Sequence, residues 1–209
     1  MKILIIGATR GIGAQLLAQA LAAQHRVTVL ARNPDKINLS DENLTVFKGD
    51  ICDPAAVSEA VSGQEAICLA IGVPITFQPV TVFSEGTLQV IKAMQDHGVQ
   101  RLICLTGIGA GDSKGHGGFL YDRIFKPLLL KTIYADKDLQ EQCVKESGLD
   151  WVIVRPAGLT NGPRTQKYRV ATDLSGVTSR RISRADVAHF ILSELSEQKY
   201  TGQTPLITY

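Results

Sequence analysis

The first thirteen residues constrain the fold of this chain more strongly than any other segment. Residues 3–6 form an apolar run typical of a buried strand, and a turn carrying Gly7, Gly11 and Gly13 follows it. A helical pattern of apolar residues begins within this turn. Glycines let a turn be tight and let a phosphate approach the backbone, while a helix N-terminus attracts anions through its N–H groups and its dipole. A glycine pattern between a strand and a helix therefore predicts a dinucleotide-binding site.

Strand-like and helical patterns alternate along the rest of the chain, whose 209 residues suit one domain with a large core. Strands are predicted at 2–6, 26–31, 44–48, 66–70, 101–106, 151–155 and 205–208. Helices are predicted at 12–24, 54–61, 80–97, about 121–147 and 184–195. This alternation predicts an α/β fold with a single doubly wound parallel sheet flanked by helices. We expect one domain over residues 1–209, with a small C-terminal extension on the substrate side.

The composition excludes several broad classes of protein. Apolar residues make up 44% and charged residues 20%, which is ordinary for a soluble globular protein. The net charge of +2 indicates no general attraction to nucleic acids or membranes, and no apolar stretch is long enough to span a bilayer. The N-terminus lacks the basic region and cleavage site of a signal peptide, so we expect a cytoplasmic protein. The cysteines show no spacing of a metal or redox motif, so we expect reduced thiols and no metal site at Cys52, Cys68, Cys104 or Cys143.

The residues after the second predicted strand indicate which dinucleotide the turn binds. A site selective for NAD usually has an acidic residue there, whereas this chain has Arg32. A guanidinium pairs well with phosphate oxygens, and Arg10 and Lys36 add positive charge, so the pattern favours NADP(H) over NAD(H). A solvated basic surface is the alternative interpretation.

The segment after the third predicted strand has two expected roles. Asp50 is placed to accept a hydrogen bond from the adenine amino group, and Ile51 to pack on the adenine ring. The alternative is a turn that starts the next helix, with Asp53 as its N-cap and Pro54 in its first turn. Both roles are compatible because they use different residues.

Six motifs carry a family resemblance. They are residues 7–13 (GATRGIG), 49–51 (GDI), 85–93 (EGTLQVIKA), 98–106 (GVQRLICLT), 147–156 (SGLDWVIVRP) and 182–188 (ISRADVA). They are spread along nearly the whole chain, and together they resemble the extended and atypical short-chain dehydrogenase/reductases. The compact length and the segment from Ala135 onward are most similar to the branch that contains biliverdin reductase B, also called flavin reductase, and the NmrA-like proteins. The resemblance implies a Rossmann-like fold and an NAD(P) cofactor.

Matching positions one at a time, the resemblance implies a complete cofactor site. The pyrophosphate turn matches Gly7, Thr9, Arg10, Gly11, Ile12 and Gly13, and the 2′-phosphate region matches Arg32 and Lys36. The adenine contacts match Asp50 and Ile51, and the segment under the adenosine ribose matches Ala70, Ile71 and Gly72. The nicotinamide surroundings match Thr106, Lys137, Pro156, Ala157, Gly158 and Leu159.

The resemblance also implies a catalytic Tyr-x-x-x-Lys pair on the long helix, and here the sequence departs from the family. Lys137 best matches the lysine, but Ile133 stands in place of the tyrosine, and Tyr134 is about 100° further around the helix. Thr106 and Gly107 stand at the family's serine position. We therefore expect Thr106 and Lys137 to position the substrate or the nicotinamide ribose, without a tyrosine as general acid.

Six glycines lie within residues 107–118, directly after the fifth predicted strand. They predict a flexible loop at the carboxyl edge of the sheet, where open α/β folds bind ligands. We expect the substrate between this loop and residues 156–162, with Phe119 and Tyr121 either walling the pocket or packing in the core.

Several polar residues near the expected site have two interpretations each. Asp136 either orients the neighbouring lysine or a ribose, or forms a surface salt bridge. A solvated face is favoured over a site for a substrate carboxylate at Arg180, Arg181 and Arg184. His116 is expected to be an exposed loop histidine rather than a proton donor.

The function expected from these features is an NADPH-dependent reductase of planar acceptors, namely a flavin, a quinone or a linear tetrapyrrole. Hydride transfer to such acceptors needs stacking and orientation above all, and solvent can supply the proton. The alternative is a non-catalytic NADP(H) sensor that acts through a protein partner. A sugar-nucleotide epimerase or dehydratase is disfavoured because it needs the tyrosine and a larger substrate domain. We expect a monomer, with a dimer through the long helices as the alternative.

Overall fold

The computed structural model describes residues 1–116, 129–177 and 179–209. The strands are β1 (Lys2–Ile6), β2 (Arg26–Ala31), β3 (Leu44–Lys48), β4 (Ala66–Leu69), β5 (Arg101–Leu105), β6 (Asp150–Pro156), β7 (Gly158–Thr160), β8 (Arg169–Ala171), β9 (Arg181–Ser183) and β10 (Leu206–Thr208). The α-helices are α1 (Gly11–Ala22), α2 (Pro54–Val61), α3 (Val82–His97), α5 (Lys131–Lys145) and α6 (Arg184–Glu197). Two short 3₁₀ turns are η1 (Pro34–Lys36) and η2 (Gly111–Ser113).

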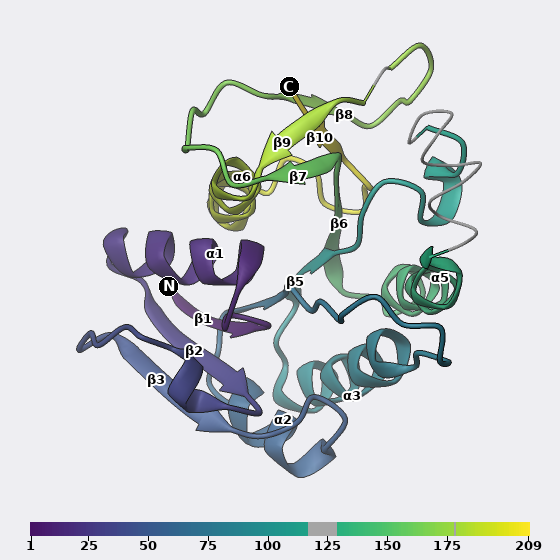
Figure 1. The fold of residues 1–209 in the computed structure, drawn as a ribbon. Helices are drawn as coiled ribbons and strands as arrows, with labels where there is room; N and C mark the ends of the chain where they lie inside the picture. The colour runs from purple at the N-terminus through teal and green to yellow at the C-terminus, as the bar shows by residue number, and fades with distance from the viewer. Residues whose placement is uncertain (117–128, 178) are drawn as a thin grey trace.

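The main sheet has eight strands in the order β3-β2-β1-β4-β5-β6-β10-β8, and β7 pairs separately with β9 (Figure 1). Every pairing is parallel except that of β10 with β8. The chain runs outward from β1 through β2 to β3, then returns to β4 and runs the other way to β6. The direction reverses between β1 and β4, and open α/β folds bind ligands in the crevice at such a point.

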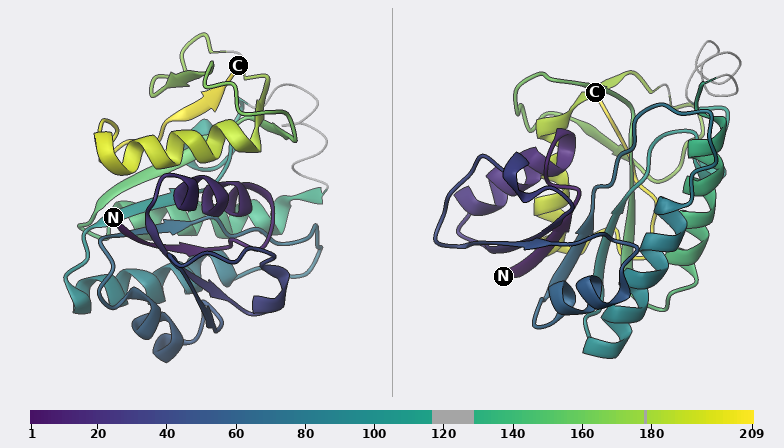
Figure 2. Two further views of the ribbon diagram at one scale, coloured as in Figure 1. Left: turned by 90° about the vertical axis from the view of Figure 1, so that its left-hand side faces the viewer. Right: turned by 60° about the horizontal axis from the view of Figure 1, so that its bottom comes forward.

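Helices cover both faces of the sheet (Figure 2). One core lies between the sheet and α1 and α6, and the other between the sheet and α2, α3 and α5. Side chains of β1 alternate between them, because Ile3 and Ile5 belong to the first core while Leu4 and Ile6 belong to the second. Burial on both faces explains why this strand is apolar throughout rather than alternating. The predicted doubly wound α/β fold is confirmed.

The strand predictions agree with β1, β2 and β3 in full, and with β4, β5, β6 and β10 to within one residue at each end. Strands β7, β8 and β9 were not predicted, because three residues are too few to show a periodicity. Helix α1 ends before the predicted position 24, where Gln24 has a left-handed φ of 59°. Helix α3 begins two residues later than predicted, and α6 extends to Glu197.

The predicted helix at 121–147 corresponds in part to α5, and residues 121–128 lie outside the described residues. Helix α2 begins as expected, because the Asp53 side chain accepts hydrogen bonds from the backbone of Ala55 and Ala56 and Pro54 follows it. Within the described residues, the helices are all too short or too polar to cross a membrane.

Candidate cofactor site at the glycine turn

The turn after β1 needs glycine at two positions because other backbone atoms occupy the side-chain space. A Cβ on Gly7 would lie 2.4 Å from the carbonyl oxygen of Ala70, and Gly7 has a φ of +100°. A Cβ on Gly13 would lie 2.1 Å from the carbonyl oxygen of Gly7. Without side chains at these two glycines, the start of α1 lies directly against the end of β1, and the end of β1 lies against the segment that follows β4. The turn is therefore held rigidly at the switch point of the sheet.

Gly11 has a different environment from these two glycines. Its φ is +64°, and the nearest atom to a Cβ built there is the Nε of Arg184, at 4.0 Å. The N-cap residue of α1, Arg10, makes no side-chain hydrogen bond to the helix, and the first turn contains no acidic residue. The space over Gly11 is thus open beside an uncapped helix N-terminus, which fits a pyrophosphate. Thr9 and Ile12 lie in the same turn, as expected.

The basic residue expected to select NADP lies at the carboxyl end of the strand next to β1. The side chain of Arg32 is 74% exposed, and its Nε lies 4.0 Å from Oδ2 of Asp50, whose side chain is 45% exposed. A pair this long and exposed holds the guanidinium only weakly. Lys36 lies nearby in η1 and is exposed. The structure therefore leaves Arg32 accessible to an anion at this edge of the sheet.

The two residues expected at the adenine differ in burial. Oδ1 of Asp50 accepts a hydrogen bond from the backbone N–H of Cys52 at 2.9 Å, which orders the turn before α2. Ile51 is only 7% exposed and packs in the core with α2 and α3. A Cβ on Gly86 of α3 would lie 2.8 Å from Cγ2 of Ile51, so Ile51 lies against that helix. Most of the Ile51 side chain therefore contributes to the core.

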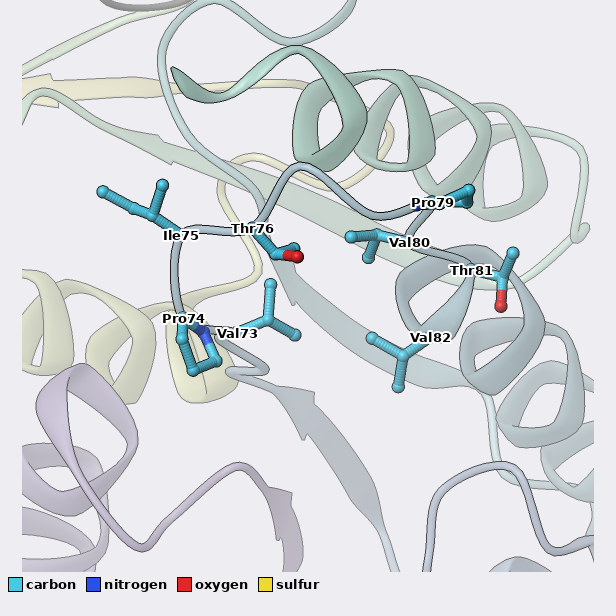
Figure 3. Close-up of a pocket in the computed structure, with 8 residues that line it drawn as sticks. All are labelled: Val73, Pro74, Ile75, Thr76, Pro79, Val80, Thr81 and Val82. Atoms are coloured by element: carbon cyan, nitrogen blue, oxygen red, sulfur yellow. The ribbon is translucent and has the colours of Figure 1, made fainter.

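The segment after β4 continues from the glycine turn into an apolar hollow. Ala70 contacts Gly7, and Nη2 of Arg10 donates to the carbonyl oxygen of Gly72 at 3.3 Å, with Ile71 between them. A cavity of about 580 Å³ follows, lined by Val73, Pro74, Ile75, Thr76, Pro79, Val80, Thr81 and Val82 (Figure 3). None of these eight residues is charged.

This cavity was not predicted, although the sequence carried a signal for it. Two prolines and seven β-branched or aromatic residues fall between β4 and α3, in a segment too irregular for a strand. Ile75 and Phe77 are 62% and 74% exposed, which is unusual for side chains so apolar. The Thr132 hydroxyl, at the start of α5, donates to the carbonyl oxygen of Thr76 at 3.2 Å and ties the segment to that helix.

Thr106 and Lys137, the two expected positioning residues, meet in the structure. Nζ of Lys137 donates to the carbonyl oxygen of Thr106 at 3.0 Å and lies 4.4 Å from the ring centroid of Phe83. Both residues are 8% exposed, and burial lowers the pKa of Lys137 to about 8. The Thr106 hydroxyl donates to Oε1 of Glu141 at 2.8 Å. The polar groups of both residues are therefore engaged by buried protein partners.

Glu141 belongs to a buried charge pair that was not predicted from the sequence. Nε of Arg155 donates to Oε1 of Glu141 at 3.0 Å, and both residues are 1% exposed. Arg155 also pairs with Asp112 at 2.5 Å. The signal for this pair was an arginine directly after the apolar run of residues 151–154, since such a charge must find a partner. The pair joins the ends of β5 and β6 to α5.

The hydroxyl of Tyr134 lies close to Gly107, one of the two residues that match the family's serine position. This hydroxyl donates to the carbonyl oxygen of Ile108 at 2.9 Å. A Cβ on Gly107 would lie 3.1 Å from the same hydroxyl oxygen, and Gly107 has a φ of +150°. Ile133, which stands in place of the family's tyrosine, is buried at 6% exposure. The glycine at position 107 thus allows the tyrosine hydroxyl to approach the end of β5.

The expected loop at residues 107–118 is packed over its first half rather than open. Ile108, Ala110 and Ser113 are buried, and the Ser113 hydroxyl accepts from the backbone N–H of Gly109 at 2.9 Å. The backbone N–H of Gly111 donates to Asp138 of α5 at 2.8 Å. Glycine at position 111 lets this segment lie close to α5 and β6, because a Cβ there would overlap the side chains of Glu141 and Arg155. Its last two residues, together with Phe119 and Tyr121, lie outside the described residues.

Two further expectations about polar residues are corrected. Asp136 is 2% exposed and accepts hydrogen bonds from the backbone N–H groups of Phe83 and Ser84, at 2.8 and 3.3 Å. It therefore caps the N-terminus of α3 instead of forming a surface salt bridge. His116 is half-buried rather than exposed, and its carbonyl oxygen accepts from the Ser179 hydroxyl at 2.9 Å.

Residues expected around the nicotinamide lie where β6 ends and β7 begins. The Pro156 carbonyl accepts from the backbone N–H of Ile108 at 3.2 Å, so this segment lies beside the end of β5. Ala157 is 3% exposed, whereas Gly158 and Leu159 are exposed in β7. The expected residues therefore gather at the carboxyl edge of the sheet, on both sides of the switch point.

Comparison with known proteins identifies a family. A family described as NAD(P)H-binding matches residues 7–198 of the chain. The Bacillus subtilis protein YhfK, named an uncharacterized sugar epimerase, is 28% identical over 204 residues, which cover 95% of this chain and 89% of YhfK. The reductase pytE of Aspergillus terreus is 26% identical, and the match covers 99% of this chain and 97% of pytE. A chloroplast protein of Arabidopsis thaliana is 27% identical over 176 residues, and the chain spans only 61% of its length.

Solved structures agree with this family. ChuY, an anaerobillin reductase from Escherichia coli O157:H7, is 26% identical and has a TM-score of 0.82, with 100% of this chain and 97% of ChuY covered. A short-chain dehydrogenase/reductase from Veillonella parvula, solved in complex with NADP, has a TM-score of 0.83 over 100% of this chain and 94% of its own. At 19% identity that second likeness shows the fold alone. The expected resemblance to the atypical short-chain dehydrogenase/reductases is confirmed.

Proposed function

The chain belongs to the NAD(P)H-binding family, and from this premise we propose that it is an NADPH-dependent reductase of planar acceptors such as flavins, quinones or linear tetrapyrroles. The observation that carries the proposal is the open space over Gly11, which adjoins the uncapped N-terminus of α1. The names of two similar proteins, the reductase pytE and the anaerobillin reductase ChuY, support reduction, whereas YhfK is named an uncharacterized sugar epimerase.

The preference for NADPH rests on the exposed arginine after β2. Arg32 is 74% exposed and only loosely paired with Asp50, so it can turn toward a 2′-phosphate and form two parallel hydrogen bonds. Lys36 adds a second positive charge on the same edge. The ribose 2′-hydroxyl of NADH offers these cations no negative charge, so its affinity is expected to be lower.

The apolar cavity between β4 and α3 supports an acceptor with a planar, apolar ring system. β5 ends at the same carboxyl edge of the sheet as β4. Two hydrogen bonds fix its backbone there, from Lys137 to the Thr106 carbonyl oxygen and from the Thr106 hydroxyl to Glu141. A bound NADPH supplies a hydride, the acceptor gains its two electrons, and the accompanying proton comes from solvent. The role of the protein is then to exclude water from the apolar wall and to stack the two ring systems.

The test measures binding before turnover. The full chain is titrated with NADPH and with NADH by cofactor fluorescence, and FMN and a soluble quinone are then added while the absorbance of the reduced cofactor is followed. We expect tighter binding of NADPH and oxidation that depends on the acceptor. Arg32→Ala should weaken NADPH binding by about tenfold to hundredfold, because a charge-assisted pair is lost, and leave NADH binding nearly unchanged.

Arg26→Ala is the matched control, because Arg26 is an exposed arginine at the opposite end of the same strand. It should leave both affinities unchanged. If neither nucleotide binds the wild-type chain, the proposal is wrong.

A second candidate function is a non-catalytic NADP(H) sensor that acts through a protein partner. The observation that favours it is the engagement of the Thr106 hydroxyl and the Lys137 ammonium by buried protein groups. Tight NADPH binding without oxidation of any acceptor would support this candidate over the reductase. Capture of a partner that is indifferent to NADP(H) would exclude it.

A further inference from the structure

Helix α6 begins beside the glycine turn, although the two are separated by most of the chain. Helices α1 and α6 lie next to each other on one face of the sheet (Figure 1). Nε2 of Gln19 in α1 donates to the carbonyl oxygen of Ala185, the second residue of α6, at 2.9 Å. This bond fixes the first turn of α6 against α1. The first residue of α6 is Arg184.

The guanidinium of Arg184 borders the open space over Gly11. Its Nε is the nearest heavy atom to a Cβ built on that glycine, at 4.0 Å. Its Nη1 donates to Oδ1 of Asn161 at 2.8 Å. Asn161 follows β7, so the arginine is oriented by the segment next to the β7–β9 pair, which follows β6 in the chain. One of five N–H donors is used in this bond, and the planar group remains suited to two-point binding of a phosphate.

The charge of Arg184 has no carboxylate partner in the described part of the chain. None lies within 4.0 Å of its nitrogens, whereas Arg101 and Arg155 each form an ion pair with a buried glutamate. Arg184 is half-buried, so its positive charge is less hydrated than that of the exposed Arg181. A half-buried cation held by a neutral amide and bordering an uncapped helix N-terminus is an environment that favours an anion.

We propose that Arg184 binds the dinucleotide through the phosphate on the nicotinamide side of the pyrophosphate. A dinucleotide crosses the switch point from β2 toward β6, with its pyrophosphate at the glycine turn. Arg32 lies at the β2 end of that path, and Arg184 reaches Gly11 from the opposite side. The two arginines therefore grip opposite halves of the same molecule. This inference rests on the proposed function, because it needs NADPH to be the ligand of the turn.

The test compares NADPH with adenosine 2′,5′-bisphosphate, which keeps the 2′-phosphate and the adenosine-side phosphate but lacks the nicotinamide half. Both are titrated calorimetrically into the full-length wild-type chain and into Arg184→Gln. The variant should bind NADPH about tenfold to hundredfold more weakly, because a charge-assisted hydrogen bond is lost. Its affinity for the bisphosphate should remain that of the wild type. Arg32→Ala should instead weaken both ligands.

Arg181→Gln is the matched control, since it removes an exposed arginine three residues away and should change neither affinity. Thermal unfolding of each variant shows that the chain remains folded. Unchanged NADPH affinity in Arg184→Gln would overturn the inference, as would an equal loss for both ligands. If the wild-type chain does not bind NADPH, the proposed function is wrong. If the wild-type chain and Arg184→Gln bind NADPH equally well, only the inference about Arg184 is wrong.

Discussion

Helices α1 and α6 begin close to each other, but only the N-terminus of α6 is capped by a side chain. Helix α1 starts at Gly11 with no side-chain cap and no acidic residue in its first turn. Helix α6 starts after Ser183, whose hydroxyl accepts from the backbone N–H of Asp186, and Asp186 itself lies in the first turn. Both helices carry the same dipole and the same unbonded N–H groups. The difference indicates that the α1 end is left for an external anion, while the Ser183 hydroxyl and a buried carboxylate of the protein itself occupy the α6 end.

Asp186 is the centre of the closed end. It is fully buried, and its Oδ1 accepts from the backbone N–H groups of Thr165 and Gln166 at 2.8 and 2.7 Å. Its Oδ2 accepts from the hydroxyl of Tyr209 at 2.6 Å. One carboxylate therefore joins α6, the segment after β7 and the last residue of the chain.

The largest predicted effect comes from removing this carboxylate. Asp186→Ala should lower the free energy of unfolding by about 3–5 kcal/mol, because several buried donors lose their acceptor at once. Urea unfolding followed by circular dichroism measures the change. Asp35→Ala, in the exposed turn η1, is the control and should leave the unfolding midpoint unchanged. A loss no larger than that of the control would show that the two helix ends do not differ as described.

The second prediction concerns pH. Burial alone would raise the pKa of Asp186, but hydrogen bonds from Tyr209, Gln166 and Thr165 outweigh it and hold the pKa below its ordinary value of 3.8. The unfolded chain therefore binds this proton first as the pH falls. The stability from Asp186 is complete well above pH 3.8 and is lost as the pH drops through and below that value.

Replacing the carboxylate by its amide isolates this contribution. The urea midpoint of the wild type should fall more steeply between pH 5 and pH 3 than that of Asp186→Asn, so the two profiles converge in acid. Asp35→Asn, which removes one exposed acidic charge, should run parallel to the wild type. Parallel profiles for Asp186→Asn would mean that the closed end does not depend on an ionised carboxylate.

The sequence predicted the elements whose signal is local. The glycine turn, the contiguous apolar strands and the Asp53 cap each depend on neighbours within a few residues, and all three are present. Strands β7, β8 and β9 were not predicted, because pairing with distant strands, rather than their own residue pattern, makes them extended.

The buried polar groups could not be predicted for a related reason. Asp136 and Glu141 sit on an ordinary polar helix pattern, and only the packing of α5 against α3 and β6 makes them a cap and an ion-pair partner. A charge in an apolar strand indicates that a partner exists, but it does not identify a partner that is many residues away. For the same reason the sequence predicted that Arg184 belongs to a solvated face. Its proximity to Gly11 depends on the packing of α6 against α1, which the sequence does not show.

The variant with the smallest predicted effect on stability, Gly11→Ala, tests the uncapped N-terminus of α1 most directly. Gly11→Ala places a methyl group where the nearest atom is 4.0 Å away, so the fold has room for it. The φ of +64° costs an alanine about 1 kcal/mol of unfolding free energy. The same methyl group stands where a phosphate must approach the backbone, so NADPH affinity should fall far more than stability does. Calorimetric titration and urea unfolding of one variant measure both quantities.

Gly63→Ala, at a similar φ of +72° with no atom within 4 Å, is the control and should show the strain without the loss of binding. If Gly11→Ala bound NADPH as tightly as Gly63→Ala does, the open end of α1 would not be the pyrophosphate site, and its contrast with α6 would be a difference in capping alone.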